Sequence, residues 1–128
     1  MKIKECILIE PFICNKDESI VDVAKKLRST TLRHIFVVDD NTYPIGIISV
    51  MDINNRVVAE AKDNTKVKAE DIMTKTIMVV DSEDDVDVTA KMMIEQNKVM
   101  NPVVKDKKMV GIIAIYQLLK NSKVDDNE

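Results

Sequence analysis

The sequence predicts an α/β (α+β) fold in which two pseudo-symmetric β-α-β-β-α repeats pack sheet to sheet. The chain has 128 residues, of which 45% are hydrophobic and 32% charged, a composition typical of a globular protein with a core. Residues 20–26 align with 86–92 at a shift of 66 positions, and residues 46–48 align with 111–113 at a shift of 65. Because one copy alone buries little apolar surface, we expect the two copies to form one compact module.

The first copy, residues 1–61, shows the pattern of elements on which this prediction depends. Apolar residues recur at helical spacing from Ile20 to Leu27 and give one buried stripe. Short apolar runs rich in β-formers flank the polar segment 39–44, which indicates a hairpin. The predicted elements are a strand at 12–14, a capping turn at 15–19, a helix from Ile20, strands at 35–38 and 45–48, and a helix at 50–61.

A linker at 62–71 leads into the second copy, residues 72–120, and a polar tail follows at 121–128. The predicted elements are a strand at 77–80, an acidic turn at 81–85, a helix at 86–96, strands at 101–104 and 109–113, and a helix at 115–120. The acidic turn lacks the central Gly and final Glu of a calcium loop, so we interpret it as a solvated turn whose charges favour the helix start.

Composition and charge argue against several classes of protein. A net charge of -3, no Trp, two Phe and two Tyr argue against nucleic acid as a partner. No apolar run approaches the roughly 18 residues that span a membrane, and no signal-peptide core is present, so we expect a cytoplasmic protein without a membrane partner. Cys6 and Cys14 are interpreted as small buried hydrophobes, and with His34 they have no metal-ligand spacing.

No combination of residues in the sequence predicts catalysis. An enzyme needs a nucleophile, an acid or base and a charge stabiliser in one pocket. The chain has one His and lacks the Gly-x-Ser-x-Gly, phosphate-loop and His-Glu-x-x-His motifs. We therefore expect no enzyme, no catalytic cofactor and no metal site.

The stretch that follows the first glycine carries the strongest functional signal. Gly46 permits close approach of a neighbouring chain or ligand, Ser49 follows three residues later, and Asp52 three residues after that. A carboxylate at a helix start can accept hydrogen bonds from the vicinal hydroxyls of a ribose. The alternative is that Ser49 or Asp52 only caps the helix. The second copy has Ala114 and Gln117 at these positions, so its site is expected to be weaker or empty.

This pattern resembles the cystathionine β-synthase (CBS) domain pair over nearly the whole chain. The likeness is carried by residues 71–74 ahead of a strand, by 33–39 as the second strand, and by 46–52 leading into a helix. It implies a stand-alone regulatory module that binds an adenosine-containing ligand, such as AMP, ADP, ATP or S-adenosylmethionine, in the cleft between the copies. It also implies a homodimer and an effector protein on a separate chain. The alternative is a ligand-free structural module for dimerisation.

The resemblance also assigns expected contacts to individual residues. These are Asp52 with the ribose, Ser49 with the ribose or phosphate, Arg33 and His34 with the phosphate, and Ile47, Thr76, Ile77 and Met78 with the adenine. For Met78, a place in the core is the alternative. In the degenerate second site the expected positions are Pro11, Phe12, Ala114 and Gln117. The basic pair Arg33 and His34 has no counterpart there, because Val99 and Met100 stand at the equivalent positions.

Overall fold

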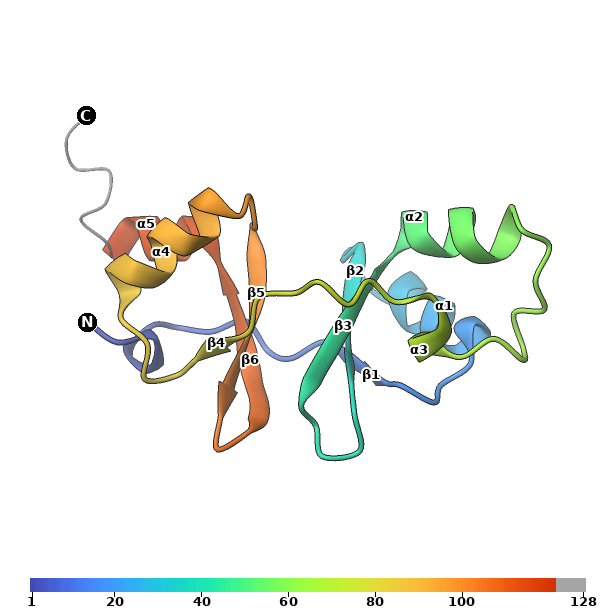
Figure 1. Ribbon diagram of the computed structural model, residues 1–128, viewed down its shortest axis with the longest axis horizontal. Helices are drawn as coiled ribbons and strands as arrows, with labels where there is room; N and C mark the ends of the chain where they lie inside the picture. The colour runs from blue at the N-terminus through green and yellow to red at the C-terminus, as the bar shows by residue number, and fades with distance from the viewer. Residues whose placement is uncertain (122–128) are drawn as a thin grey trace. The chain divides into compact units, whose positions relative to one another are not determined.

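The computed structural model describes residues 1–121, and positions 122–128 of the predicted polar tail lie outside the described residues (Figure 1). The chain divides into two compact units. Unit 2 is Phe12–Ile77, and unit 1 combines Met1–Pro11 with the chain from Met78 onwards. Each unit therefore joins the body of one sequence copy to the segment that leads into the other copy. The sequence repeats, residues 1–61 and 72–120, divide the chain at other points than these units do, and their boundaries stay a prediction.

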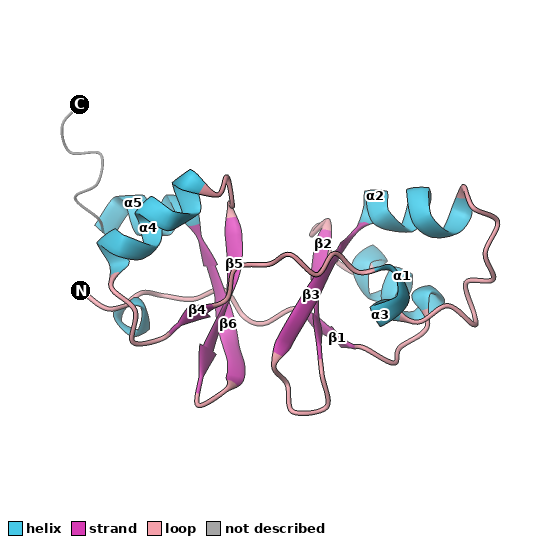
Figure 2. Cartoon of the chain, in the orientation of Figure 1, coloured by secondary structure: helices cyan, strands magenta, loops and turns pink. Residues whose placement is uncertain are grey.

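Unit 2 contains a three-stranded mixed sheet with its helices on one face (Figure 2). Its elements are β1 (Ile13–Asn15), α1 (Ile20–Arg28), β2 (His34–Val38), β3 (Pro44–Ser49), α2 (Val50–Ile53), a π-helical turn (Asn54–Val58) and α3 (Ala69–Ile72). Strand β2 pairs parallel with β1 and antiparallel with β3. The helix predicted at 50–61 is shorter than expected, because helical structure ends at Val58 and Ala61 has a φ of 54°, a left-handed conformation that terminates helices.

The two faces of the unit 2 sheet carry different side chains. Ile35, Val37 and Ile48 belong to the core cluster, which also includes residues of α1 and α3. Because successive side chains alternate in a strand, the residues between them point to the opposite face. On that face the register sets His34 against Ser49 and Phe36 against Ile47. The fold therefore brings residues of the predicted ligand site together within one unit.

Unit 1 repeats this architecture with helices α4 and α5 on one side of its sheet (Figure 2). Its elements are a 3-10 helix (Ile3–Glu5), β4 (Val80–Asp81), α4 (Val86–Glu95), β5 (Met100–Lys105), β6 (Lys108–Ala114) and α5 (Ile115–Asn121). Strand β5 pairs parallel with β4 and antiparallel with β6. Two three-stranded mixed sheets with helices confirm the predicted α/β fold.

The strand predicted at 77–80 is wrong over most of its length, since only Val80 and Asp81 join the sheet. In unit 2, Phe36 N donates to Phe12 O (3.2 Å), and the residue equivalent to Phe36 in unit 1 is Pro102, which has no N–H. The side chain of Asn101, only 1% exposed, supplies the missing donor. With its amide nitrogen facing the two carbonyls, it donates to Met78 O (3.2 Å) and Met100 O (3.1 Å).

Both glycines lie where a second backbone segment crosses an outer strand. In unit 2, Ile47 and Thr74 exchange two backbone hydrogen bonds (3.0 and 2.9 Å), and a Cβ at Gly46 would lie 2.5 Å from Met73 Sδ and 3.0 Å from Thr74 O. Unit 1 has the same arrangement with residues from its N-terminal segment. Ile9 and Ile112 exchange two bonds of 2.9 Å, and a Cβ at Gly111 would lie 2.7 Å from Leu8 Cβ.

We expect Gly111→Ala to destabilise the protein by about 1–3 kcal/mol, as overpacking of a tight site does. Gly46→Ala is expected to cost less, because the nearest atom is the sulfur of a flexible methionine, whereas at Gly111 it is a Cβ fixed to the backbone. Denaturant unfolding of both variants measures the difference. If the two variants lose equal free energy of unfolding, or if Gly46→Ala loses more, then the rigidity of the nearest neighbouring atom does not determine the cost of a side chain at these glycines.

Candidate functional site

Ser49 and Asp52 form a reciprocal capping box at the start of α2. Asp52 N donates to Ser49 Oγ (3.0 Å), and Ser49 N donates to Asp52 Oδ2 (2.8 Å). This is the local arrangement that satisfies backbone donors at a helix start. The capping role considered from the sequence is therefore present. It uses one oxygen of a carboxylate that has acceptor capacity for about four hydrogen bonds.

Arg56, one helical turn after Asp52, is a site residue that the sequence interpretation missed. Its Nη2 lies 3.7 Å from Asp52 Oδ1, and its Nη1 donates to Ile72 O (2.6 Å) and Thr74 Oγ1 (3.3 Å). The Asp side chain is 20% exposed and the Arg side chain 46%. The signal available in the sequence was the spacing i,i+4 between an acidic and a basic residue, which places the two on one helix face.

The basic pair lies beside this capping box. His34 stands opposite Ser49 in the ladder between β2 and β3, and Val50 N donates to Arg33 O (3.1 Å). Both Arg33 and His34 are exposed. Directly opposed residues of an antiparallel pair have neighbouring side chains. Unit 2 therefore gathers the ribose and phosphate candidates at one end of its sheet, with half-buried Ile47 on the same face as Ser49.

The three remaining candidates for the adenine wall follow the segment that crosses β3. Thr76 is exposed and Ile77 half-buried, and they lie two and three residues after Thr74, the partner of Ile47. Met78 is 9% exposed and belongs to the core cluster of unit 1. Within unit 1, Met78 is therefore a core residue, which is the alternative considered from the sequence. The contact of Thr76, Ile77 and Met78 with an adenine ring stays a prediction.

At the equivalent place in unit 1, the side-chain amide of Gln117 makes hydrogen bonds with two backbone groups. Ala114 N donates to Gln117 Oε1 (3.1 Å), and Gln117 Nε2 donates to Ile7 O (2.7 Å). Gln117 thus caps the helix start as Asp52 does and holds a backbone carbonyl as Arg56 does. Of the other two candidates for this second site, Phe12 packs against the core of unit 2, and Pro11 is half-buried.

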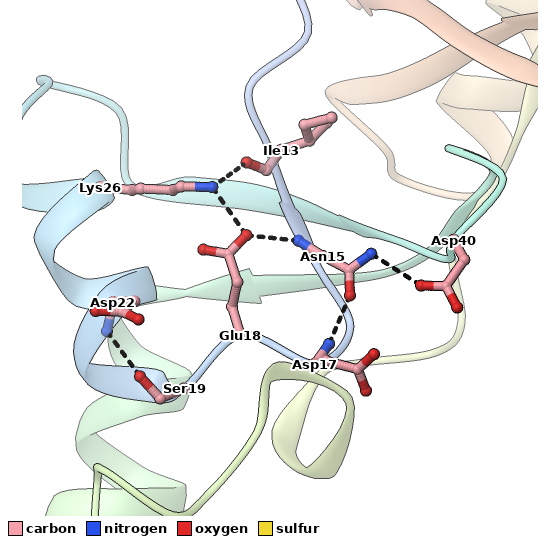
Figure 3. A network of polar contacts seen from close by, with 8 residues as sticks. All are labelled: Ile13, Asn15, Asp17, Glu18, Ser19, Asp22, Lys26 and Asp40. Carbon is pink, nitrogen blue, oxygen red and sulfur yellow. Dashed lines mark hydrogen bonds and ion pairs between the residues drawn. The ribbon is translucent and has the colours of Figure 1, made fainter.

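In each of the polar turns that precede α1 and α4, a glutamate accepts hydrogen bonds that fix the turn. In unit 2, Glu18 accepts from Asn15 N (2.7 Å) and from Lys26 Nζ (2.9 Å), and Lys26 also donates to Ile13 O (3.2 Å; Figure 3). In unit 1, Glu83 pairs with Lys2 (2.7 Å) and Lys4 (2.9 Å). Hydrogen bonds from these two lysines lower the pKa of Glu83 to about 2.

The acidic turn of unit 1 also provides the start of α4. Asp85 accepts from Val88 N (3.0 Å), and Asp84 accepts from Asp81 N (2.9 Å). Among the described residues, no group of three or more His, Cys, Asp or Glu is arranged to hold a metal ion. Within the same part of the chain, no helix has the length and apolar character needed to cross a membrane.

Cys14 and Cys6 lie in different units, and burial acts on both thiols. Cys14 is buried in the core of unit 2, where desolvation raises its pKa to about 12. Cys6 is half-buried, and burial raises its pKa as well. Because the thiolate is the reactive form, a raised pKa leaves each group protonated at neutral pH.

In the folded protein at pH 8, we expect iodoacetamide to leave Cys14 unmodified and to modify Cys6 slowly. Unfolding in denaturant removes the burial, so both thiols should then react at the rate of an ordinary cysteine. Mass spectrometry of the digested protein after timed labelling measures each rate. Labelling of Cys14 in the folded protein at the rate of Cys6 would show that the core of unit 2 does not protect it.

The structure thus consists of two α/β units of the same architecture, with a carboxylate at the start of α2 and a neutral amide at the equivalent start of α5. The profile of the CBS domain matches residues 3–59 and 69–123, so the chain belongs to the CBS domain family. CBS domain pairs generally act as regulatory sensors, are typically non-catalytic, commonly bind adenosyl ligands and often dimerise.

The chain is also similar to parts of longer proteins and to a solved structure. An uncharacterized protein of Methanopyrus kandleri is 30% identical over 104 residues, which are 80% of this chain and 53% of that protein. L-aspartate semialdehyde sulfurtransferase of Methanocaldococcus jannaschii is 30% identical over 112 residues, 87% of this chain and 21% of the enzyme. The chain thus spans about half of the first relative and about a fifth of the second. The structure of Staphylococcus aureus OpuCA has the same fold, with a TM-score of 0.74, 23% identity, and coverage of 89% of this chain and 93% of that one.

Proposed function

We propose that this chain is a regulatory sensor module that binds an adenosine-containing ligand, AMP, ADP, ATP or S-adenosylmethionine, and transmits the occupancy of its site to a partner protein. The ribose is held by Asp52 and Ser49, and the phosphate or other charged end by Arg33 and His34. The adenine is taken up by Ile47, Thr76, Ile77 and Met78. Such a module regulates because its ligand has different affinities for two states of the protein.

The observation that supports this proposal best is the difference between the two helix starts. In unit 2, Asp52 brings a charged carboxylate to α2, with Arg33 and His34 on the adjacent strand end. In unit 1, Gln117 has no charge, and its amide nitrogen is engaged by Ile7 O at 2.7 Å. A carboxylate accepts hydrogen bonds from two vicinal hydroxyls more strongly than a neutral amide does. We therefore assign one adenosyl site to each chain, at the first copy.

A second candidate function is a module that binds no ligand and serves only for dimerisation. The capping box supports this candidate, because Ser49 and Asp52 satisfy each other's backbone N–H groups without any ligand. Under this alternative, the basic residues Arg33 and His34 are ordinary solvated charges. The two functions differ in one measurable property, the affinity for adenosine compounds.

We expect Asp52→Asn to weaken binding of the recognised nucleotide by about 10- to 100-fold, since it removes the charge from an acceptor of two hydrogen bonds. The amide oxygen still accepts from Ser49 N, so the cap is preserved. Arg33→Ala should weaken binding of AMP and ATP and leave adenosine unaffected. Isothermal calorimetry with adenosine, AMP, ADP, ATP and S-adenosylmethionine measures these affinities.

The matched control is Gln117→Ala at the equivalent position of unit 1. This variant should change the nucleotide affinity by less than about twofold. Equal losses for Asp52→Asn and Gln117→Ala would overturn the assignment of the site to unit 2. Absence of binding by every compound, together with a dimer in analytical ultracentrifugation, would favour the ligand-free module.

A further inference from the structure

Arg56 is shared between the proposed ribose carboxylate and a backbone segment of the same unit. Its Nη1 donates to Ile72 O at 2.6 Å, a short bond to the carbonyl of a buried residue, and reaches Thr74 Oγ1 at 3.3 Å. Its Nη2 lies 3.7 Å from Asp52 Oδ1, which is an ion pair but too long for a hydrogen bond. The guanidinium is thus held closely by the segment and loosely by the carboxylate.

The segment that Arg56 holds leads to one of the two ends at which unit 2 continues into unit 1. Thr74 exchanges two backbone hydrogen bonds with Ile47 on β3, and Met73 packs against Gly46. Three residues beyond Thr74 the chain reaches Ile77, the last residue of unit 2. A change in how firmly this segment is held therefore acts on the chain just before the junction Ile77–Met78, one of the two covalent junctions between the units.

Unit 1 holds its own crossing segment without a charge. Gln117 Nε2 donates to Ile7 O, and Ile9 pairs with Ile112 as Thr74 pairs with Ile47. Here the residue that caps the helix is also the residue that holds the carbonyl. In unit 2 the two tasks are divided between Asp52 and Arg56, so the charge on Asp52 can influence the donor that holds Ile72.

We infer that Arg56 is a positioning residue that couples the occupancy of Asp52 to the hold on Ile72–Thr74, an inference that rests on the proposed function. Asp52 and the segment attract one guanidinium from two sides, Asp52 through Nη2 and the segment through Nη1. When ribose hydroxyls donate to the carboxylate, its attraction for Nη2 weakens, and Nη1 keeps Ile72 O and shortens its 3.3 Å contact with Thr74 Oγ1. Ligand binding at the first copy therefore tightens one of the two segments that connect the units.

The test is amide hydrogen exchange of Thr74 and Ile47 in the whole chain, measured by NMR without ligand. We expect Arg56→Met to speed exchange at both amides about tenfold, as loss of a charged hydrogen bond does, and Arg56→Lys to restore part of the protection. Asp52→Asn, which keeps the cap, is expected to slow the same amides about twofold, the size of the effect of a weak, partly exposed ion pair. In the Arg56→Met background, Asp52→Asn should have no effect.

The sign of the Asp52→Asn effect shows whether Asp52 draws Arg56 away from the segment or only helps to hold it in place. If the ion pair is merely structural, exchange becomes faster in Asp52→Asn as well as in Arg56→Met. Ile9 and Ile112, the matched pair in unit 1, report whether the variants remain folded and should keep their rates. Faster or unchanged exchange in Asp52→Asn, or an effect that persists with Arg56→Met, would overturn the coupling.

The same amides are then measured with AMP and with ATP. Saturating nucleotide should slow exchange at Thr74 and Ile47 in the wild type, and this change should disappear in Arg56→Met. Nucleotide that binds in calorimetry without slowing these amides would overturn the coupling and leave the proposed function intact. If no nucleotide binds, the proposed function fails, and the Asp52 and Arg56 cycle on the unliganded protein still decides whether the two residues compete.

Discussion

The fold of each unit depends on one contact, the close crossing of a second backbone segment over an outer strand at a glycine. Gly46 admits Met73 and Thr74, and Gly111 admits Leu8 and Ile9. In each case the crossing segment adds two backbone hydrogen bonds to the sheet. These are the chain's two glycines, and neither has a positive φ. They are required for the space that a side chain would fill and not for backbone freedom.

The same crossing explains why two similar units have different chemistry. Each crossing segment leaves a backbone carbonyl near the helix start, Ile72 O in unit 2 and Ile7 O in unit 1, and in each unit a side chain of the following helix donates to it. In unit 1 this donor is Gln117, the side chain that also caps the helix. In unit 2 the donor is Arg56, so Asp52 keeps a carboxylate oxygen that no backbone group engages at hydrogen-bond distance among the described residues. This division of tasks is the physical basis for the ligand site that we propose in the first copy.

The sequence predicted the repeat and the hairpin of each copy, because apolar periodicity and turn residues are local signals. The grouping of Ser49 with Arg33 and His34 was implied by the family resemblance. The sequence prediction failed at residues 77–79, where the missing N–H of Pro102 ends the parallel ladder and buried Asn101 supplies the donor. It also missed Arg56, because the partners of that side chain lie 16 and 18 residues away in the chain. Long-range donors to a backbone carbonyl leave no periodic signal, whereas capping pairs such as Ser49 and Asp52 do.

The central claim is that one chain carries one adenosyl site, at the start of α2 and not at the start of α5. The most direct measurement is a ¹⁵N correlation spectrum of the whole chain titrated with AMP, and then with ATP and S-adenosylmethionine. The account predicts that the amide signals of His34, Ser49 and Asp52 move with a common saturation curve while those of Ala114 and Gln117 stay in place. Movement of both sets together, of the Ala114 and Gln117 signals alone, or of neither set with any of the three compounds would contradict it.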